Sequence, residues 1–191
     1  MAHKFDVKNR HKLDNEKRRK MLPPEKTLIS LGLHAGDIMA DIGCGIGYFS
    51  IPATKIVQGS GKVFALDISP EMLKEVETTA KENSCFNIET VLTKENNFML
   101  EEGKITFAFI CNVLHETENL VGFLTQVKNI LSSKGKIAII DWQKIDTEDG
   151  PPLEHRLDEL ELLKLLKTLG FSNIESVAIG KNFYGITAIR L

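Results

Sequence analysis

The chain has 191 residues, 42% of them hydrophobic, and its formal net charge is −2. Such a length fits one globular domain and leaves little room for a second. The opening MAHKFDVKNR lacks the apolar core of a signal peptide, and no apolar run approaches the roughly 20 residues that cross a bilayer. We therefore expect one domain over residues 1–191, in a cytoplasmic protein without a membrane partner.

Three cysteines, Cys44, Cys85 and Cys111, are spread along the chain without any CxxC or Cys/His cluster. This pattern predicts neither a disulfide framework nor a zinc site. Asp141 also lacks an acidic neighbour after the preceding strand-like run, which ends in Cys111-Asn112, so a hard cation would find few ligands. We expect reduced thiols and no metal.

The first 20 residues are basic, with eight Lys and Arg against three acidic residues and a net charge of +5. A basic arm can meet nucleic acid or an anionic ligand, although a solvated terminus is the commoner meaning. Pro23-Pro24 then leads into a short helix. We expect residues 1–32 to form an arm and a short helix, and residues 33–191 to form the core.

Short apolar runs alternate with helical patterns along the rest of the chain. The runs are rich in β-branched and aromatic residues, which predicts strands buried on both faces of a parallel sheet. The predicted strands are 38–41, 62–67, 88–92, 106–111 and 136–142. The predicted helices are 48–57, 70–82, 120–131 and 153–169, the last with Leu157, Leu160, Leu163 and Leu166 on one face.

This alternation predicts an α/β fold, a doubly wound and mostly parallel sheet with helices on both faces. Two more strand-like runs, 173–179 and 183–189, are separated by only a few residues. That separation permits a hairpin but no crossover. The expected sheet thus has seven strands and ends in an antiparallel hairpin.

The stretch MADIGCGIGYFS, residues 39–50, leaves the first strand and enters the first helix. Its alternate glycines allow a sharp turn and a close ligand approach, and the helix offers unpaired N–H groups. A tight turn without a ligand would look similar. Asp67, at the end of the second strand, adds a carboxylate that can accept both hydroxyls of a ribose, which favours a nucleoside-containing cofactor.

Asp41, just before the glycines, separates two kinds of cofactor. A carboxylate there repels the pyrophosphate of a dinucleotide but attracts the ammonium of a methionine moiety. With this feature, DIGCGIGYFS resembles the first motif of the class I S-adenosylmethionine-dependent methyltransferases, which have a Rossmann-like fold. The likeness continues through VFALDISPEML, FAFICNVLHE and GKIAIIDWQK over residues 22–191, and is strongest to the small methyltransferases of ubiquinone and menaquinone biosynthesis.

The resemblance implies a set of cofactor-binding residues. The glycine loop with Asp41 would hold the methionine portion, Asp67 the ribose, and Ile68 with Met72 one face of the adenine. The full expected set is Asp41, Gly43, Cys44, Gly45, Tyr48, Asp67, Ile68, Met72, Glu95, Asn96, Asn112 and Val113.

Asn112 and Val113, after the fourth strand, would line the sulfonium side. After the third strand many relatives carry Gly-Asp-Ala, whereas this chain has Thr93-Lys94-Glu95. The adenine contact is therefore assigned to Glu95, with Asn96 nearby; a solvated loop carboxylate is the equal alternative.

His115 in NVLHE is the expected catalytic base, because it follows the fourth strand at the edge where the crevice opens and histidine titrates near neutrality. A structural histidine is the alternative reading. Trp142 could touch the acceptor or only pack, and His155 and Arg156 could face the pocket or water.

We therefore expect an S-adenosylmethionine-dependent methyltransferase that acts on a small acceptor, anionic or quinone-like, with the N-terminal segment as a lid. Three alternatives stay open: an RNA-directed methyltransferase, a non-catalytic cofactor-binding module, and a nicotinamide-dependent oxidoreductase. The chain has no Asn/Asp-Pro-Pro-aromatic motif and no Pro-Cys nucleophile, which speaks against the known base-modifying types. The sequence names neither the acceptor atom nor the oligomeric state.

Overall fold

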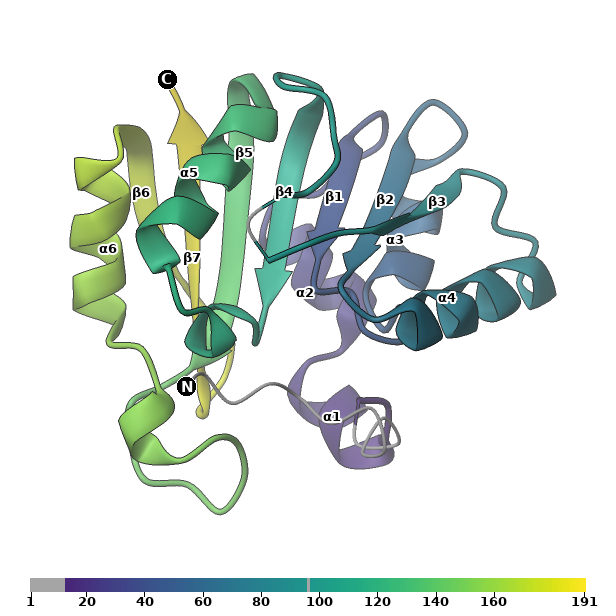
Figure 1. Cartoon of the computed structure of the whole chain (residues 1–191). Coiled ribbons are helices and arrows are strands. Elements are labelled where there is room, and N and C mark those ends of the chain that lie inside the picture. The colour runs from purple at the N-terminus through teal and green to yellow at the C-terminus, as the bar shows by residue number, and fades with distance from the viewer. Residues whose placement is uncertain (1–12, 96) are drawn as a thin grey trace.

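In the computed structural model, which describes residues 13–95 and 97–191, seven strands form one sheet in the order β3-β2-β1-β4-β5-β7-β6 (Figure 1). The strands are β1 (Ile38–Ile42), β2 (Lys62–Asp67), β3 (Ile88–Leu92), β4 (Ile105–Cys111), β5 (Leu131–Trp142), β6 (Phe171–Ala178) and β7 (Phe183–Arg190).

The first five strands are parallel, and β7 pairs antiparallel with both β5 and β6. Strands β1 and β4 lie in the centre and are almost entirely buried, as their continuous apolar runs predict. The predicted fold class is confirmed, including the antiparallel terminal hairpin. The order reverses between β1 and β4, so the loops after these two strands meet at the carboxyl edge of the sheet.

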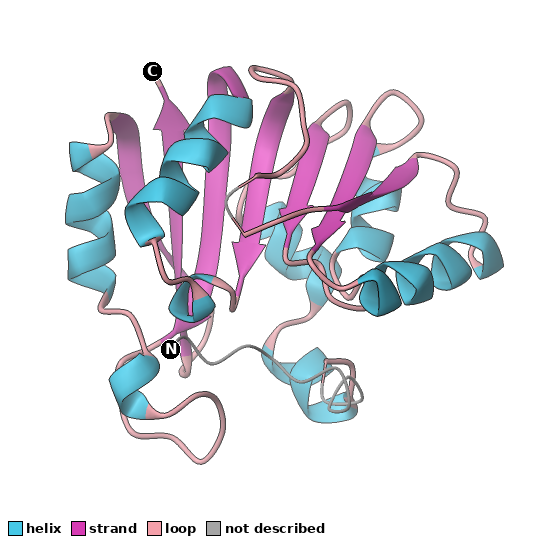
Figure 2. Ribbon diagram, viewed as in Figure 1, coloured by secondary structure: helices cyan, strands magenta, loops and turns pink. Residues whose placement is uncertain are grey.

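Helices cover both faces of the sheet and make three layers (Figure 2). Apolar side chains of α2, α3 and α4 pack on one face, and those of α5 and α6 pack on the other. The helices are α1 (Glu16–Met21), α2 (Pro24–Ser30), α3 (Ser50–Val57), α4 (Pro70–Glu82), α5 (Leu120–Ile130) and α6 (Glu159–Thr168). No described helix is both long and apolar enough to cross a membrane.

The predicted helix 153–169 is wrong over residues 153–158. Residues Leu153–His155 form a single 3-10 turn, and α6 begins only after Asp158, whose side chain accepts a hydrogen bond from Glu161 N at 3.1 Å. Of the predicted leucine face, Leu157, Leu163 and Leu166 pack on the core, whereas Leu160 is 65% exposed and Leu162 is buried instead. Capping by Asp158 sets where the helix begins.

Arg156 explains why the chain leaves helical geometry before Asp158. Its guanidinium is buried and donates to four main-chain carbonyls and one hydroxyl in the loop that follows β5. These acceptors are the carbonyls of Gln143, Ile145, Asp149 and Pro151 and the Thr147 hydroxyl, at 2.6–3.1 Å. The guanidinium also lies 5.3 Å from the centre of the Trp142 ring. This one side chain fixes the path of residues 143–151.

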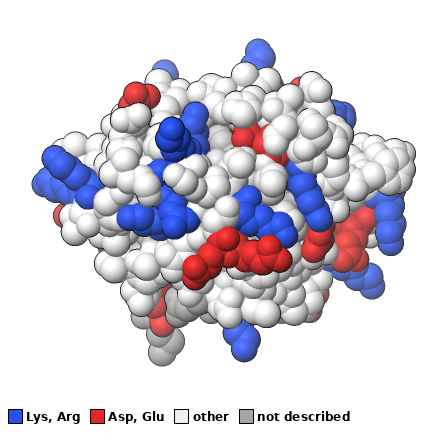
Figure 3. Space-filling view, turned by 90° about the horizontal axis from the view of Figure 1, so that it is seen from above, with Lys and Arg blue, Asp and Glu red and all other residues white. Residues whose placement is uncertain are grey.

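The opposite, amino edge of the parallel strands carries many Lys and Arg side chains beside a row of acidic ones (Figure 3). Crossover helices end at this edge, where their last carbonyls carry partial negative charge. Lys128 Nζ donates to Leu169 O after α6, and Arg190 Nη1 donates to Asn129 O in α5. Helix ends therefore account for these two cations.

We expect Arg156→Met to lower the free energy of unfolding by about 3 kcal/mol, because several buried carbonyls lose their donor. Chemical denaturation measures this change, and hydrogen exchange should increase selectively in residues 143–151. Arg19→Met, on the exposed side of α1, is the matched control and should leave both readouts unchanged. Wild-type stability in Arg156→Met would contradict the role given to this network.

Candidate active site

The loop between β1 and α3 has three glycines with positive φ angles, Gly43, Gly45 and Gly47. Gly43 and Gly45 have φ angles of 75° and 54°, in the left-handed region that favours glycine. A Cβ on Gly43 would also lie 2.4 Å from Val113 Cγ2. The main-chain N–H groups of Gly43 and Cys44 both donate to Leu66 O, at 2.8 and 2.9 Å, so this loop is held against the end of β2.

Asp67 at the end of β2 links the glycine loop to the start of α4. Its Oδ2 accepts from Gly45 N and its Oδ1 accepts from Ser69 N, both at 2.9 Å. Burial raises the pKa of Asp67, and these main-chain donors oppose that rise. Each carboxylate oxygen has a further lone pair, so the side chain can still accept hydrogen bonds from a ligand.

Asp41 is the buried acid of the site. It is only 3% exposed, and its Oδ2 accepts a 2.5 Å hydrogen bond from Ser50 Oγ. Burial raises the pKa of Asp41 to about 7, although the Ser50 hydrogen bond acts in the opposite direction. A cation placed beside this carboxyl would favour its ionised form.

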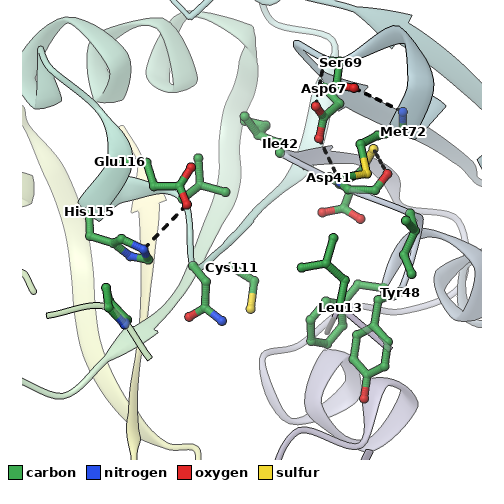
Figure 4. A pocket seen from close by; sticks show the side chains of 18 of the residues that line it. Leu13, Asp41, Ile42, Tyr48, Asp67, Ser69, Met72, Cys111, His115 and Glu116 are labelled. Carbon is green, nitrogen blue, oxygen red and sulfur yellow. Dashed lines mark hydrogen bonds and ion pairs between the residues drawn. The ribbon is translucent and has the colours of Figure 1, made fainter. Parts of the chain in front are cut away.

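These residues line one cavity of about 1330 Å³ at the carboxyl edge of the sheet (Figure 4). The structure brings twelve of the predicted site residues together on its wall, while Asn96 lies outside the described residues. The twelve are Asp41, Gly43, Cys44, Gly45, Tyr48, Asp67, Ile68, Met72, Glu95, Asn112, Val113 and His115. Whether each contacts the cofactor remains a prediction.

Several of these side chains already have protein partners. Tyr48 donates from its hydroxyl to Leu22 O at 2.8 Å, which ties the N-terminal segment to the glycine loop. Glu95 Oε1 accepts from Glu118 N at 3.0 Å. By contrast, Asn112 Oδ1 is buried and has no hydrogen-bond partner among the described residues, so it is available to a ligand.

The outer wall of the cavity comes from α1 and from the loop after β5. Lys17 Nζ in α1 lies 2.5 Å from Asp149 Oδ2 in that loop, so the two segments meet. The ring of Trp142 lines the cavity and packs against Phe183, with ring centres 4.4 Å apart. His155 lines the cavity as well, whereas Arg156 does not.

His115 and Asp141 form a buried pair at the ends of the neighbouring strands β4 and β5. His115 Nδ1 lies 2.7 Å from Asp141 Oδ1, and because a carboxylate only accepts, Nδ1 carries the hydrogen. Nε2 is then left to accept a proton, with Glu116 Oε1 3.9 Å away. Burial lowers the pKa of His115, but the hydrogen bond and charge of Asp141 outweigh it, and the pKa lies above its ordinary value.

Sequence reasoning placed Asp141 at this edge but did not pair it with His115. The signal was present, since both residues follow adjacent parallel strands, whose carboxyl ends meet. The two residues between Asn112 and His115 hid the contact, because the 3-10 turn Leu114–Glu116 brings the imidazole back to Asp141. Arg18 and the loop residues 148–152 were also missed as parts of the cavity wall.

We expect Asp141→Asn to lower the pKa of His115 below its wild-type value, because the desolvation remains while the opposing charge is lost. NMR titration of the imidazole resonances measures this pKa directly. Glu116→Gln, which removes a smaller raising effect, should lower the pKa less. An unchanged titration in Asp141→Asn would show that the pair does not control His115.

Comparison with solved structures places this geometry in a known group. The chain is 31% identical to a SAM-dependent methyltransferase from Aquifex aeolicus, with a TM-score of 0.93 over 98% of this chain and 100% of that one. A putative type 11 methyltransferase from Sulfolobus solfataricus is 24% identical, with a TM-score of 0.68 over 81% of this chain and 84% of that one.

Sequence comparison also finds methyltransferases. A probable cobalt-precorrin-6B C(15)-methyltransferase from Methanosarcina mazei is 28% identical over 82% of this chain and 77% of its own length. A demethylmenaquinone methyltransferase from Lactococcus lactis is 28% identical over 61% of this chain, which spans 46% of that protein. The family model described as a methyltransferase domain matches residues 39–135. The chain therefore belongs to the methyltransferase-domain family and is a class I enzyme that uses S-adenosylmethionine.

Proposed function

We propose that this methyltransferase acts on a small molecule, anionic or quinone-like, that enters the cavity beside His115. The observation that carries the proposal is the enclosure of the cavity by α1 and the loop after β5, joined by the Lys17–Asp149 ion pair. A cavity of about 1330 Å³ has room for the cofactor and a small acceptor, and walls on both sides of its mouth disfavour a folded RNA or protein.

The names of the relatives support a small acceptor. The Methanosarcina protein is named for cobalt-precorrin-6B, the Lactococcus protein for demethylmenaquinone, and a Streptomyces relative for aklanonic acid. Other relatives are named for ribosomal protein L11. The walls that α1 and the loop after β5 add to the cavity favour the first kind of acceptor for this chain.

The residues of the cavity fit S-adenosylmethionine, which supplies a methyl group on an activated sulfonium. Glycines without Cβ atoms and the buried carboxyl of Asp41 suit its amino acid portion, and Asp67 retains lone pairs for the ribose hydroxyls. Ile68 and Met72 offer apolar surface for the adenine. We infer that Asn112, whose Oδ1 has no hydrogen-bond partner among the described residues, lines the sulfonium side.

Besides binding the cofactor, the residues of the cavity would position the two reactants and remove a proton from the acceptor. Because the methyl carbon is already activated, holding the two reactants in line and away from water supplies much of the rate. A hydroxyl or an acidic carbon must also lose a proton. Nε2 of His115 can take that proton, while Asp141 holds the ring in the right tautomer and stabilises the resulting imidazolium.

We expect Asp67→Ala to weaken S-adenosylhomocysteine binding roughly 10- to 100-fold, because a charged acceptor of hydroxyl hydrogen bonds is worth ~1.5–3 kcal/mol. Isothermal titration calorimetry gives the affinity, and the melting temperature shows whether the loop linkage through Gly45 has been lost as well. Glu89→Ala, an exposed carboxylate on β3, is the control. An unchanged affinity in Asp67→Ala would show that the ribose is held elsewhere.

A second experiment tests the acceptor and the base together. A cell extract is incubated with the enzyme and methyl-labelled S-adenosylmethionine, and we expect label in the small-molecule fraction. His115→Gln should reduce that transfer by roughly 10²–10⁴-fold, because glutamine cannot take the proton, and His34→Gln, with an exposed histidine, should not. Wild-type turnover should also fall as the pH drops through the raised pKa of His115.

Three results would contradict the proposal. Label that appears only in RNA or protein would favour a macromolecular acceptor. Full transfer by His115→Gln would leave a reaction that depends on positioning alone. Cofactor binding with no transfer to any fraction would favour a non-catalytic binding module.

A further inference from the structure

Arg18 is a cation in the cavity wall for which no ion pair with a described carboxylate is found. It lies in α1, and its Nε is buried without a hydrogen-bond partner among the described residues. The centre of the guanidinium lies 4.8 Å from the centre of the Tyr48 ring. Stacking of this kind uses the face of the guanidinium and leaves its N–H groups to bind in the plane.

The other cations of α1 differ from Arg18. Each already has a carboxylate within ion-pair distance, in the pairs Lys17–Asp149, Arg19–Asp14 and Lys20–Glu16, at 2.5, 2.5 and 2.7 Å. Within residues 13–95 and 97–191, Arg18 is the cation of this helix for which no such pair exists. An arginine that lines a cavity without a carboxylate is suited to an anionic ligand group.

The position of Arg18 indicates which ligand group this is. The guanidinium lies over the ring of Tyr48, which follows the glycine loop directly, so Arg18 is at the Asp41 end of the cavity. In agreement, its charge lowers the pKa of Asp41 and of Cys111 against the larger effect of burial. An α-amino acid carries its ammonium and its carboxylate on one carbon. A carboxyl and a guanidinium at the same end of a cavity therefore match both charges of such a group.

We propose that Arg18 binds the carboxylate of the methionine portion of the cofactor, and through this contact holds α1 over the cavity. The inference rests on the proposed placement of that portion beside Asp41. A bidentate carboxylate would satisfy Nε together with one terminal nitrogen of the guanidinium. An acceptor carboxylate has the same chemistry, but nothing places it at the Asp41 end.

The contact matters for α1 because little else holds this helix. None of its residues is buried, and its Lys17–Asp149 pair is largely exposed, so that pair contributes little stability. The Tyr48 hydroxyl binds the chain just after the helix, at Leu22 O. A ligand carboxylate on Arg18 would add a charged contact from within the cavity, so binding of the amino acid portion would close the lid.

Two ligands distinguish the proposed contact of Arg18 from the proposed placement of the methionine portion beside Asp41. S-adenosylhomocysteine carries the amino acid portion, whereas 5′-methylthioadenosine has the adenosine and the sulfur without it. By calorimetry we expect Arg18→Met to weaken S-adenosylhomocysteine binding at least about tenfold and to leave methylthioadenosine binding within about twofold. Arg19→Met, on the same helix, should change neither affinity. Arg18→Lys keeps the charge but lacks the two parallel N–H donors of a guanidinium. Its affinity for S-adenosylhomocysteine should lie between those of the wild type and Arg18→Met.

Limited proteolysis reports on the lid itself, because trypsin cleaves after Lys and Arg and residues 17–20 are all of these types. S-adenosylhomocysteine should slow cleavage at these positions in the wild type and in Arg19→Met. Methylthioadenosine should not slow it, and Arg18→Met should lose the protection.

Three outcomes would overturn the inference. Equal losses for both ligands in Arg18→Met would mean that the arginine acts through lid packing and not through a carboxylate. Unchanged S-adenosylhomocysteine affinity in Arg18→Met would indicate that the guanidinium binds an anionic acceptor instead of the cofactor. Wild-type protein that binds neither ligand would contradict the placement of the cofactor, and the role of Arg18 with it.

Discussion

The carboxylate of Asp67 is the interaction on which the cofactor end of the cavity depends. It holds the glycine loop through Gly45 N and the start of α4 through Ser69 N, so two crossovers of the sheet are fixed relative to each other. The carbonyl of Leu66 adds two further hydrogen bonds to the same loop. A sharp, glycine-rich turn would otherwise be mobile, because glycine loses more conformational freedom on folding than other residues. Here the end of β2 supplies the acceptors that keep it in one conformation.

Charge is distributed unevenly between the two edges of the sheet, and helix direction explains part of it. The buried carboxyls of Asp41 and Asp141 and the partly buried carboxyl of Asp67 lie at the carboxyl edge, where helix N-termini lie. At the amino edge, where helices end, Lys and Arg side chains lie beside a row of acidic ones (Figure 3). The carboxyls at the carboxyl edge favour a ligand that places its positive groups near them.

Most of the fold could be predicted from the sequence, because buried parallel strands read as continuous apolar runs and the final hairpin is too short for a crossover. The glycine loop and Asp67 could be predicted for the same reason, since strand order places them at one edge. The error at 153–169 arose because a leucine-rich pattern continues past the point where Asp158 caps the helix and Arg156 turns to the loop carbonyls. The His115–Asp141 pair depends on a single 3-10 turn, and the contact of Arg18 with Tyr48 joins segments 30 residues apart, so neither leaves a periodic signal.

The way in which Arg156 binds the loop after β5 bears on how such an enzyme could diversify. Four of its five acceptors are main-chain carbonyls, which every residue type provides. The path of the loop therefore depends little on which side chains stand at positions 148 and 152, although both line the cavity. Substitutions there can change the size, charge or polarity offered to an acceptor while the scaffold stays intact. Arg156 thus fixes the shape of this part of the cavity wall independently of the side chains that give the wall its chemistry. Acceptor preference can therefore change in evolution at low cost in stability.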